Sequence, residues 1–210
     1  VIILAHVLHS AVTHGFLPSA LSAQKSVLIV TDHAEDYRNA LASTHPQVRV
    51  IDCDVFNPLS VIGCLLDQQV RPDAILSNSD HLQSSAAIIA KWFGLPAKDW
   101  RLCVAAKNKA QTRARARELG LPTPWSAILP PDAPIPTNIP FPIVAKPVEG
   151  VASLDVSLCR TAEELRIFRN RVASHVIRPL LLEAYLEGDL FTVETLGDGR
   201  DLQLIGGFDV

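Results

Sequence analysis

The sequence lacks an excess of positive charge, and it lacks an apolar run long enough to cross a bilayer. Its 210 residues include 19 Lys and Arg against 22 Asp and Glu, a formal net charge of −3 at pH 7. Nucleic acids and anionic membranes attract strongly basic surfaces, so neither is an expected partner. The apolar opening, residues 1–12, has no basic residue before it and is too short to span a membrane. Small molecules or protein are the expected partners.

Paired cysteines are also missing. The four cysteines form no CxxC motif and have no regular spacing, so neither a zinc knuckle nor a disulfide framework is indicated. They are Cys53, Cys64, Cys103 and Cys159. Thiols of this kind are typical of reduced cytoplasmic proteins, and a cytoplasmic location is expected.

The start of the chain has three histidines but little else that binds metal. His6, His9 and His14 cluster there, and no carboxylate or cysteine accompanies them in the sequence. Protein zinc sites commonly combine imidazole with such ligands. A metal site is therefore disfavoured, and no metal ligand is predicted in this chain.

The sequence does have the composition of a well-packed globular protein, with 48% hydrophobic and 20% charged residues. Up to about residue 96, short apolar runs alternate with longer amphipathic ones, the pattern of a parallel sheet covered by helices. Strands are predicted at 2–8, 27–31, 48–52 and 74–77, and helices at 13–23, 36–43, 58–69 and 81–93. The predicted class is α/β, with an open parallel domain over residues 1–96. No GxGxxG follows the first strand, so a dinucleotide site is disfavoured.

Polar residues follow three of the predicted strands, as TDH at 31–33, DCD at 52–54 and SNSD at 77–80. Open α/β sheets usually bind ligands at the carboxyl ends of their strands. Two interpretations stay open: Asp32, Asn78 and Asp80 contact a ligand, or they cap the helices that follow. We predict that the SNSD turn lies at the carboxyl edge of the sheet and faces a ligand cleft.

A connector is predicted at 97–140, with a basic helix over 100–120 and a proline-rich loop at 130–140. Of Arg113, Arg115 and Arg117, only the first and last share a helical face, and most of this charge is expected on a solvated surface. A second domain of different topology, 141–210, is predicted to contain two strands around a small-residue loop, a helix at 161–174, a strand at 180–183 and a hairpin around GDGR at 197–200.

The stretch PFPIVAKPVEGVASLDV places Lys146 inside an apolar run. Leaving an ammonium group unpaired in such a place costs several kcal/mol, roughly the penalty for any lone buried ion, so an anion is expected beside it. The following loop contains Gly150, Ala152 and Ser153, and its backbone N–H groups can approach oxyanions closely. The alternative is a hairpin turn beside an edge-strand lysine.

Three stretches in order, KNKAQTRARARELGLPTP, PFPIVAKPVEGVAS and LLLEAYLEGDLFTVE, resemble the ATP-grasp superfamily of carboxylate–amine ligases. In that family a lysine from an (Asp/Asn)-Lys pair opens a helix ending in Gly-Leu-Pro-x-Pro, which matches Lys109 here. A second lysine lies in a Val-x-Lys-Pro strand, which matches Lys146. The resemblance implies a pre-ATP-grasp α/β domain followed by the first α+β part of an ATP-grasp domain.

The resemblance also implies roles for particular residues. Two lysines would contact the ATP phosphates, the small-residue loop would close over them, and the segment at 183–186 would meet the adenine edge, with the Glu183 side chain accepting from the exocyclic amine. The implied binding residues are Lys109, Lys146, Gly150, Ala152, Ser153, Glu183, Ala184, Leu186 and, for the ribose, Asp189. ATP and Mg2+ are the implied cofactors.

The sequence departs from the family at several points. Gly188-Asp189-Leu190 stands where Gly-x-Glu commonly holds the ribose, and Asp155 stands where a glycine is common. By this resemblance, the family's magnesium ligands and acyl-phosphate arginine come from strands beyond the equivalent of Val210. The catalytic residues therefore stay unknown, and the C-terminal part is expected to be missing.

The implied function is an ATP-dependent ligase that forms an amide through an acyl phosphate. The stretch after residue 182 looks most like the amino-acid ligases of dipeptide and siderophore biosynthesis. Small-molecule carboxylates and amines are the implied substrates, and a homodimer is left open. The alternative is a nucleotide-binding module or regulatory subunit without catalysis.

Overall fold

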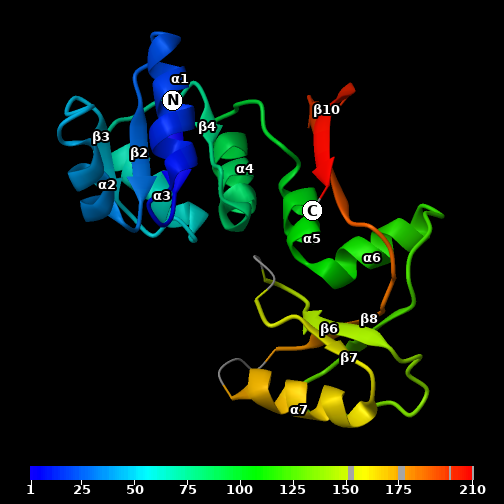
Figure 1. Cartoon of the computed structure of the whole chain (residues 1–210). Coiled ribbons are helices and arrows are strands. Elements are labelled where there is room, and N and C mark those ends of the chain that lie inside the picture. The colour runs from blue at the N-terminus through cyan, green and yellow to red at the C-terminus, as the bar shows by residue number, and fades with distance from the viewer. Residues whose placement is uncertain (151–153, 175–177, 199, 210) are drawn as a thin grey trace. The chain divides into compact units, whose positions relative to one another are not determined.

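Four short parallel strands organise the first part of the chain (Figure 1). The computed structural model describes residues 1–150, 154–174, 178–198 and 200–209. The sheet has the order β3-β2-β1-β4, with β1 at Ile2–Ala5, β2 at Leu28–Thr31, β3 at Arg49–Asp52 and β4 at Ile75–Leu76. The chain runs outward from β1 to β3 and then crosses back to place β4 on the other side of β1, as in doubly wound folds.

Helices cover this sheet because both of its faces are apolar. Ile2 and Leu4 belong to one buried cluster, whereas Ile3 and Ala5 belong to another, as expected when side chains alternate along a strand. The first cluster includes residues of α3 (Pro58–Asp67) and α4 (Gln83–Trp92), and the second those of η1 (Ala11–Phe16), α1 (Leu17–Ser22) and α2 (Ala34–Leu41). The short helix η2 (Asp80–Leu82) precedes α4.

The helix predicted at 100–120 is two helices, α5 (Trp100–Lys107) and α6 (Lys109–Glu118). Asn108 has an extended backbone, and its side-chain oxygen accepts hydrogen bonds from Ala110 N and Gln111 N, both at 3.1 Å. This is the geometry of a helix N-cap, which starts a new helix and ends the previous one. The chain divides here into two units, 1–107 and 108–210, and the boundaries at 96 and 140 stay a prediction.

A second sheet, entirely antiparallel, has the order β5-β8-β6-β7. Its strands are β5 (Ser126–Leu129), β6 (Ile143–Pro147), β7 (Ser157–Cys159) and β8 (Leu180–Ala184), and β5 lies where the sequence pattern predicts no strand. Helix α7 (Ala162–Ala173) contributes Leu165, Phe168 and Val172 to the core beneath this sheet.

The predicted hairpin is formed by β9 (Phe191–Gly197) and β10 (Leu202–Asp209), with a register shift between Leu204 and Gly206. Large apolar side chains are exposed along both strands, among them Phe191, Leu204 and Phe208. Two-stranded hairpins are only marginally stable alone, so this hairpin contributes little stability to the fold by itself.

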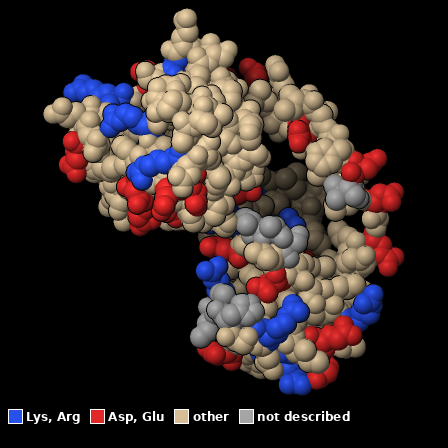
Figure 2. All heavy atoms as spheres, turned by 60° about the vertical axis from the view of Figure 1, so that its left-hand side comes forward, with Lys and Arg blue, Asp and Glu red and all other residues tan. Residues whose placement is uncertain are grey.

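The predicted fold class is confirmed: a parallel α/β sheet is followed by antiparallel sheets. Among the described residues, no helix combines the length and apolar character that a membrane crossing needs. On the face shown in Figure 2, Lys and Arg are interspersed with Asp and Glu rather than gathered into one basic patch.

The hydroxyl of Thr161 is expected to stabilise α7. It accepts a hydrogen bond from Glu164 N at 3.2 Å, and the Glu164 carboxylate reaches back to Arg160 N at 2.7 Å. Thr161→Ala should lower the free energy of unfolding by about 1 kcal/mol, measured by urea denaturation, because a helix N–H loses its acceptor. Thr161→Ser is the matched control. An equal loss in both variants would show that the methyl group, not the hydroxyl, stabilises the helix.

Candidate functional site

The anion expected beside Lys146 is Glu183. The Lys146 ammonium forms an ion pair with the Glu183 carboxylate, and Arg113 of α6 forms a second one with the same group. The strands bring the first pair together because β6 and β8 are neighbours with Val144 opposite Glu183. The Glu183 side chain is only 6% exposed, whereas those of Lys146 and Arg113 are 19% and 34% exposed.

This arrangement keeps Glu183 charged. Burial alone would raise its pKa, but the hydrogen bonds and positive charges of Lys146 and Arg113 outweigh burial and hold the pKa below its usual range. Two cations on one carboxylate leave one positive charge uncompensated. The surface around Lys146 therefore still favours an anionic ligand after the internal pairs have formed.

The start of α6 is tied to the loop that follows β6. Lys109 N donates to Val148 O at 2.8 Å, the Lys109 ammonium donates to Gly150 O at 2.7 Å, and the Asn108 amide donates to Glu149 at 3.3 Å. Gly150 has φ of +152°, which side chains rarely adopt. Lys109 therefore sits at the base of the loop predicted to hold phosphates.

The two lysines lie close enough to affect each other. Burial lowers the pKa of Lys109 first, and the charge of Lys146 lowers it further, against the opposing effects of Glu149 and Glu183. A bound anion would relieve this repulsion, since it favours the charged form of Lys109.

Two of the backbone donors at the end of β8 have partners within the second unit. Ala184 N donates to Trp125 O at 2.9 Å and Tyr185 N to Pro142 O at 3.0 Å, whereas no hydrogen bond joins Leu186 N to another described residue. The Ala184 N–H is therefore occupied, and whether the Ala184 and Leu186 backbones complete an edge contact stays a prediction. Each oxygen of the Glu183 carboxylate already contacts one cation, Arg113 or Lys146.

The structure gives less information about the other predicted site residues and about Asp155. Asp189 is exposed, and within the described ranges it forms no hydrogen bond or ion pair with Lys109, Lys146 or Glu183. Ala152 and Ser153 lie outside the described residues. Asp155, which stands where the family often has glycine, has φ of +53°, a conformation that favours glycine.

Arg113 is the site residue that the sequence reasoning missed. The arginines of α6 were expected on a solvated surface, but Arg113 binds Glu183 and Arg117 binds the Ser126 hydroxyl. Lys109, Arg113 and Arg117 are spaced four residues apart and so share one face of the helix. This four-residue spacing is visible in the sequence and indicates that Arg113 lies on the same side of the helix as the predicted phosphate-binding Lys109.

The turns after β2 and β4 behave differently from simple helix caps. Asp32 lies 2.9 Å from His6 rather than capping α2, so the fold brings a carboxylate to one of the N-terminal histidines although none is near it in the sequence. The SNSD turn directly follows β4, and its Ser77 hydroxyl accepts from Ser79 N at 3.2 Å. Whether this turn faces a ligand cleft stays a prediction.

The Glu183 pairs predict a pH-dependent stability. Glu183→Gln should lower the free energy of unfolding at pH 7 by about 2 kcal/mol, less than the 3–5 kcal/mol typical of a fully buried pair because Arg113 can turn to solvent. A depressed folded-state pKa stabilises the protein above the unfolded pKa, near 4.3, and that contribution is lost as the pH falls through the folded value.

Urea denaturation of the wild type and Glu183→Gln between pH 7 and pH 3 measures this difference, which should shrink as the pH falls. Glu187→Gln, at an exposed position, is the matched control and should change little. A difference for Glu183→Gln that stayed constant over this pH range would contradict the assignment.

Known proteins share this architecture. No protein-family model matches the sequence. A D-alanine–D-alanine ligase from Halorhodospira halophila is 38% identical over 80 residues, which are 38% of this chain and 26% of that ligase. The solved structure of an L-amino acid ligase from Bacillus licheniformis has a TM-score of 0.79 and 19% identity, over 99% of this chain and 50% of that one. The solved structure of D-alanine–D-alanine ligase from Bacillus anthracis complexed with ATP has a TM-score of 0.64 and 14% identity. The match covers 95% of this chain and 62% of that one.

The fold defined by these likenesses is that of the N-terminal half of ATP-grasp enzymes. The resemblance seen in the sequence is thereby confirmed at the level of the fold, which this chain shares with those ligases. The chain spans about half the length of the L-amino acid ligase, and the matched segment spans about a quarter of the curated ligase.

Proposed function

We propose that this chain holds the adenine nucleotide of an ATP-dependent carboxylate–amine ligase. The observation that supports this proposal most directly is the pair of neighbouring ammonium groups, Lys109 and Lys146, next to a strand end whose Leu186 N–H has no partner among the described residues. Two lysines spread positive charge over a triphosphate, and an unpaired backbone donor can meet the edge of a base.

In the proposed reaction a substrate carboxylate oxygen attacks the γ-phosphorus of ATP, the bond from that phosphorus to the bridging oxygen breaks, and ADP leaves. The amine nitrogen then attacks the acyl carbon, inorganic phosphate leaves, and the amine loses a proton to give the amide. Lys109 and Lys146 would stabilise negative charge on the phosphates during the first step.

Mg2+ fits this site through the nucleotide rather than through the protein. Among the described residues of 108–210, no three His, Cys, Asp or Glu side chains converge on one point. A magnesium ion would therefore be held chiefly by the phosphates of ATP, where it neutralises charge. ATP and Mg2+ are the cofactors that we propose.

The similarity to amino-acid ligases supports amino acids as substrates. An L-amino acid ligase and D-alanine–D-alanine ligases are among the similar proteins. We therefore propose an amino acid or related small carboxylate as acyl donor and a second amine as acceptor, as in dipeptide or siderophore biosynthesis, in a cytoplasmic setting where ATP is supplied.

The competing function is a nucleotide-binding module or regulatory subunit without catalysis. The complete product of the encoding gene separates the two functions. ADP release that depends on a particular pair of carboxylate and amine supports the ligase, and nucleotide binding without turnover for any pair supports the module.

Lys146→Ala in the complete protein should weaken ATP binding by roughly ten-fold to more than a hundred-fold. The expected loss is that of charge-assisted contacts worth about 1.5–3 kcal/mol. Calorimetric titration with Mg·ATP measures it, and Lys91→Ala, at an exposed position of the first unit, is the control. A thermal melt of the same sample detects any loss of stability. Unchanged ATP affinity with a lowered melting temperature would make Lys146 a structural residue only.

A further inference from the structure

A second cluster of polar side chains lies in the first unit, at the carboxyl ends of β1 and β2. These strands are parallel neighbours with Ala5 opposite Thr31, so the residues that follow them, His6 on one side and Asp32 with His33 on the other, come side by side. Twenty-six residues separate His6 from Asp32 in the sequence. The strand register, rather than any local motif, brings the three together.

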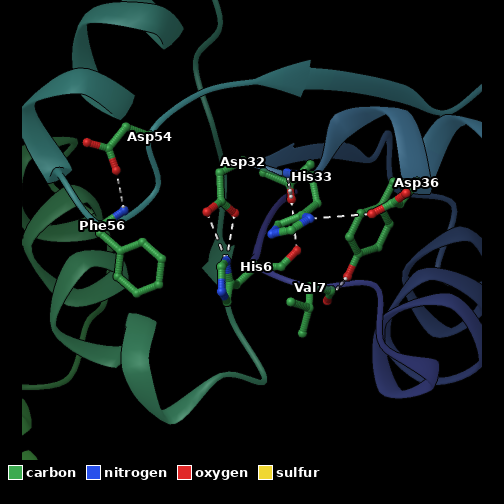
Figure 3. Close-up of polar contacts among 9 residues, drawn as sticks. His6, Val7, Asp32, His33, Asp36, Asp54 and Phe56 are labelled. Atoms are coloured by element: carbon green, nitrogen blue, oxygen red, sulfur yellow. Dashed lines mark hydrogen bonds and ion pairs between the residues drawn. The ribbon is translucent and has the colours of Figure 1, made fainter. Parts of the chain in front are cut away.

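The three side chains converge on a small volume (Figure 3). His6 Nδ1 lies 2.9 Å from both carboxylate oxygens of Asp32, and one possible ligand atom from each of His6, Asp32 and His33 lies within 4.8 Å of the others. All three residues are half-buried. They are therefore accessible to an ion from solvent and still constrained by the fold.

The backbone beneath the cluster is fixed by a fully buried residue. The Thr31 hydroxyl donates to His6 O and accepts from His33 N, both at 3.1 Å. One side chain thus sets the positions of both histidines. Tyr37, also buried, donates to Val7 O at 3.1 Å and holds the segment just after His6.

The imidazole of His33 has the partner typical of a metal ligand. Its Nδ1 lies 3.4 Å from the Asp36 carboxylate, which leaves Nε2 for an ion. Histidines that bind metals usually donate their other ring N–H to a carboxylate or carbonyl group, which fixes the orientation of the ring.

Aromatic rings surround the same point. The ring centroids of His6 and His33 are 4.9 Å apart, as are those of His6 and Phe56. Phe56 follows β3 and is itself 6.4 Å from the His81 ring, which follows β4. These ring contacts restrict the orientation of the His6 imidazole beside His33 and Phe56.

We propose that His6, Asp32 and His33 bind a divalent transition-metal ion of the zinc class. Two imidazoles and one carboxylate are a ligand set suited to zinc and its neighbours, whereas magnesium and calcium prefer oxygen ligands alone. Bonds of about 2.0–2.2 Å would require the ligand atoms to close on the ion by small side-chain rotations. Three protein ligands leave a coordination position open for water or a substrate group. The site uses residues of 1–107 and is independent of the proposed nucleotide function.

The test uses the 210-residue chain without a histidine tag, stripped of metal with a chelator. Calorimetric titration with Zn2+ should give one bound ion per chain, and Co2+ should produce a visible absorption band that Zn2+ abolishes. His6→Ala, Asp32→Asn and His33→Gln should each reduce Zn2+ affinity by more than about tenfold, and Asp36→Asn by about tenfold through the orientation of His33. His14→Ala, an exposed histidine outside the cluster, should leave the affinity unchanged.

Thermal melts in chelator establish that each variant is folded, and three independent ligand substitutions keep the test valid if one of them is not. Added Zn2+ should raise the melting temperature of the wild type but not of the His33→Gln variant, because only a folded site binds the ion. The absence of saturable Zn2+ binding by the wild type, or equal affinities of the wild type and the three ligand variants, would overturn the proposal.

Discussion

The second unit depends on one buried charge, the carboxylate of Glu183, which is shared by Lys146 and Arg113. A buried carboxylate without partners would be strongly destabilising, so both cations are held near it. Because Arg113 comes from α6 and Lys146 from β6, this interaction joins the helix to the sheet. It also fixes the side of α6 that faces the sheet, and with it the position of Lys109 at the start of the helix. The proposed phosphate-binding lysines are thus placed by an anion that belongs to the protein.

The same principle operates at both candidate sites: chemically active residues follow buried strands. In the first unit, apolar residues of β1 and β2 fill the core, and His6 and Asp32 follow immediately at the sheet edge. In the second, β8 is buried up to Glu183, and the Leu186 N–H, which bonds to no other residue in the described part of the chain, lies just beyond the strand end. The buried strands hold the polar groups that follow them in fixed positions, and those groups themselves lie outside the core.

Patterns within the sequence predicted the fold class, because alternating apolar and amphipathic runs report burial directly. They were misleading at Asn108, where a side-chain cap divides a helix that composition alone would continue. The need for an anion near Lys146 was predicted from the cost of burying a charge, and the partner proved to be Glu183. The contacts between Arg113 and Glu183 and between His6 and Asp32 were not predicted, since they join residues 70 and 26 positions apart through tertiary packing and strand register.

Amide chemical-shift mapping tests the central claim, that residues 108–210 hold an adenine nucleotide, most directly. The 210-residue chain, labelled with nitrogen-15, is titrated with a non-hydrolysable Mg·ATP analogue up to millimolar concentration, where even weak binding with a free energy of about −4 kcal/mol is visible. The account predicts that the largest shifts occur at the amides of Leu186, Lys109 and Gly150, with little change in 1–107. An absence of shifts at these three amides, or shifts confined to 1–107, would contradict it.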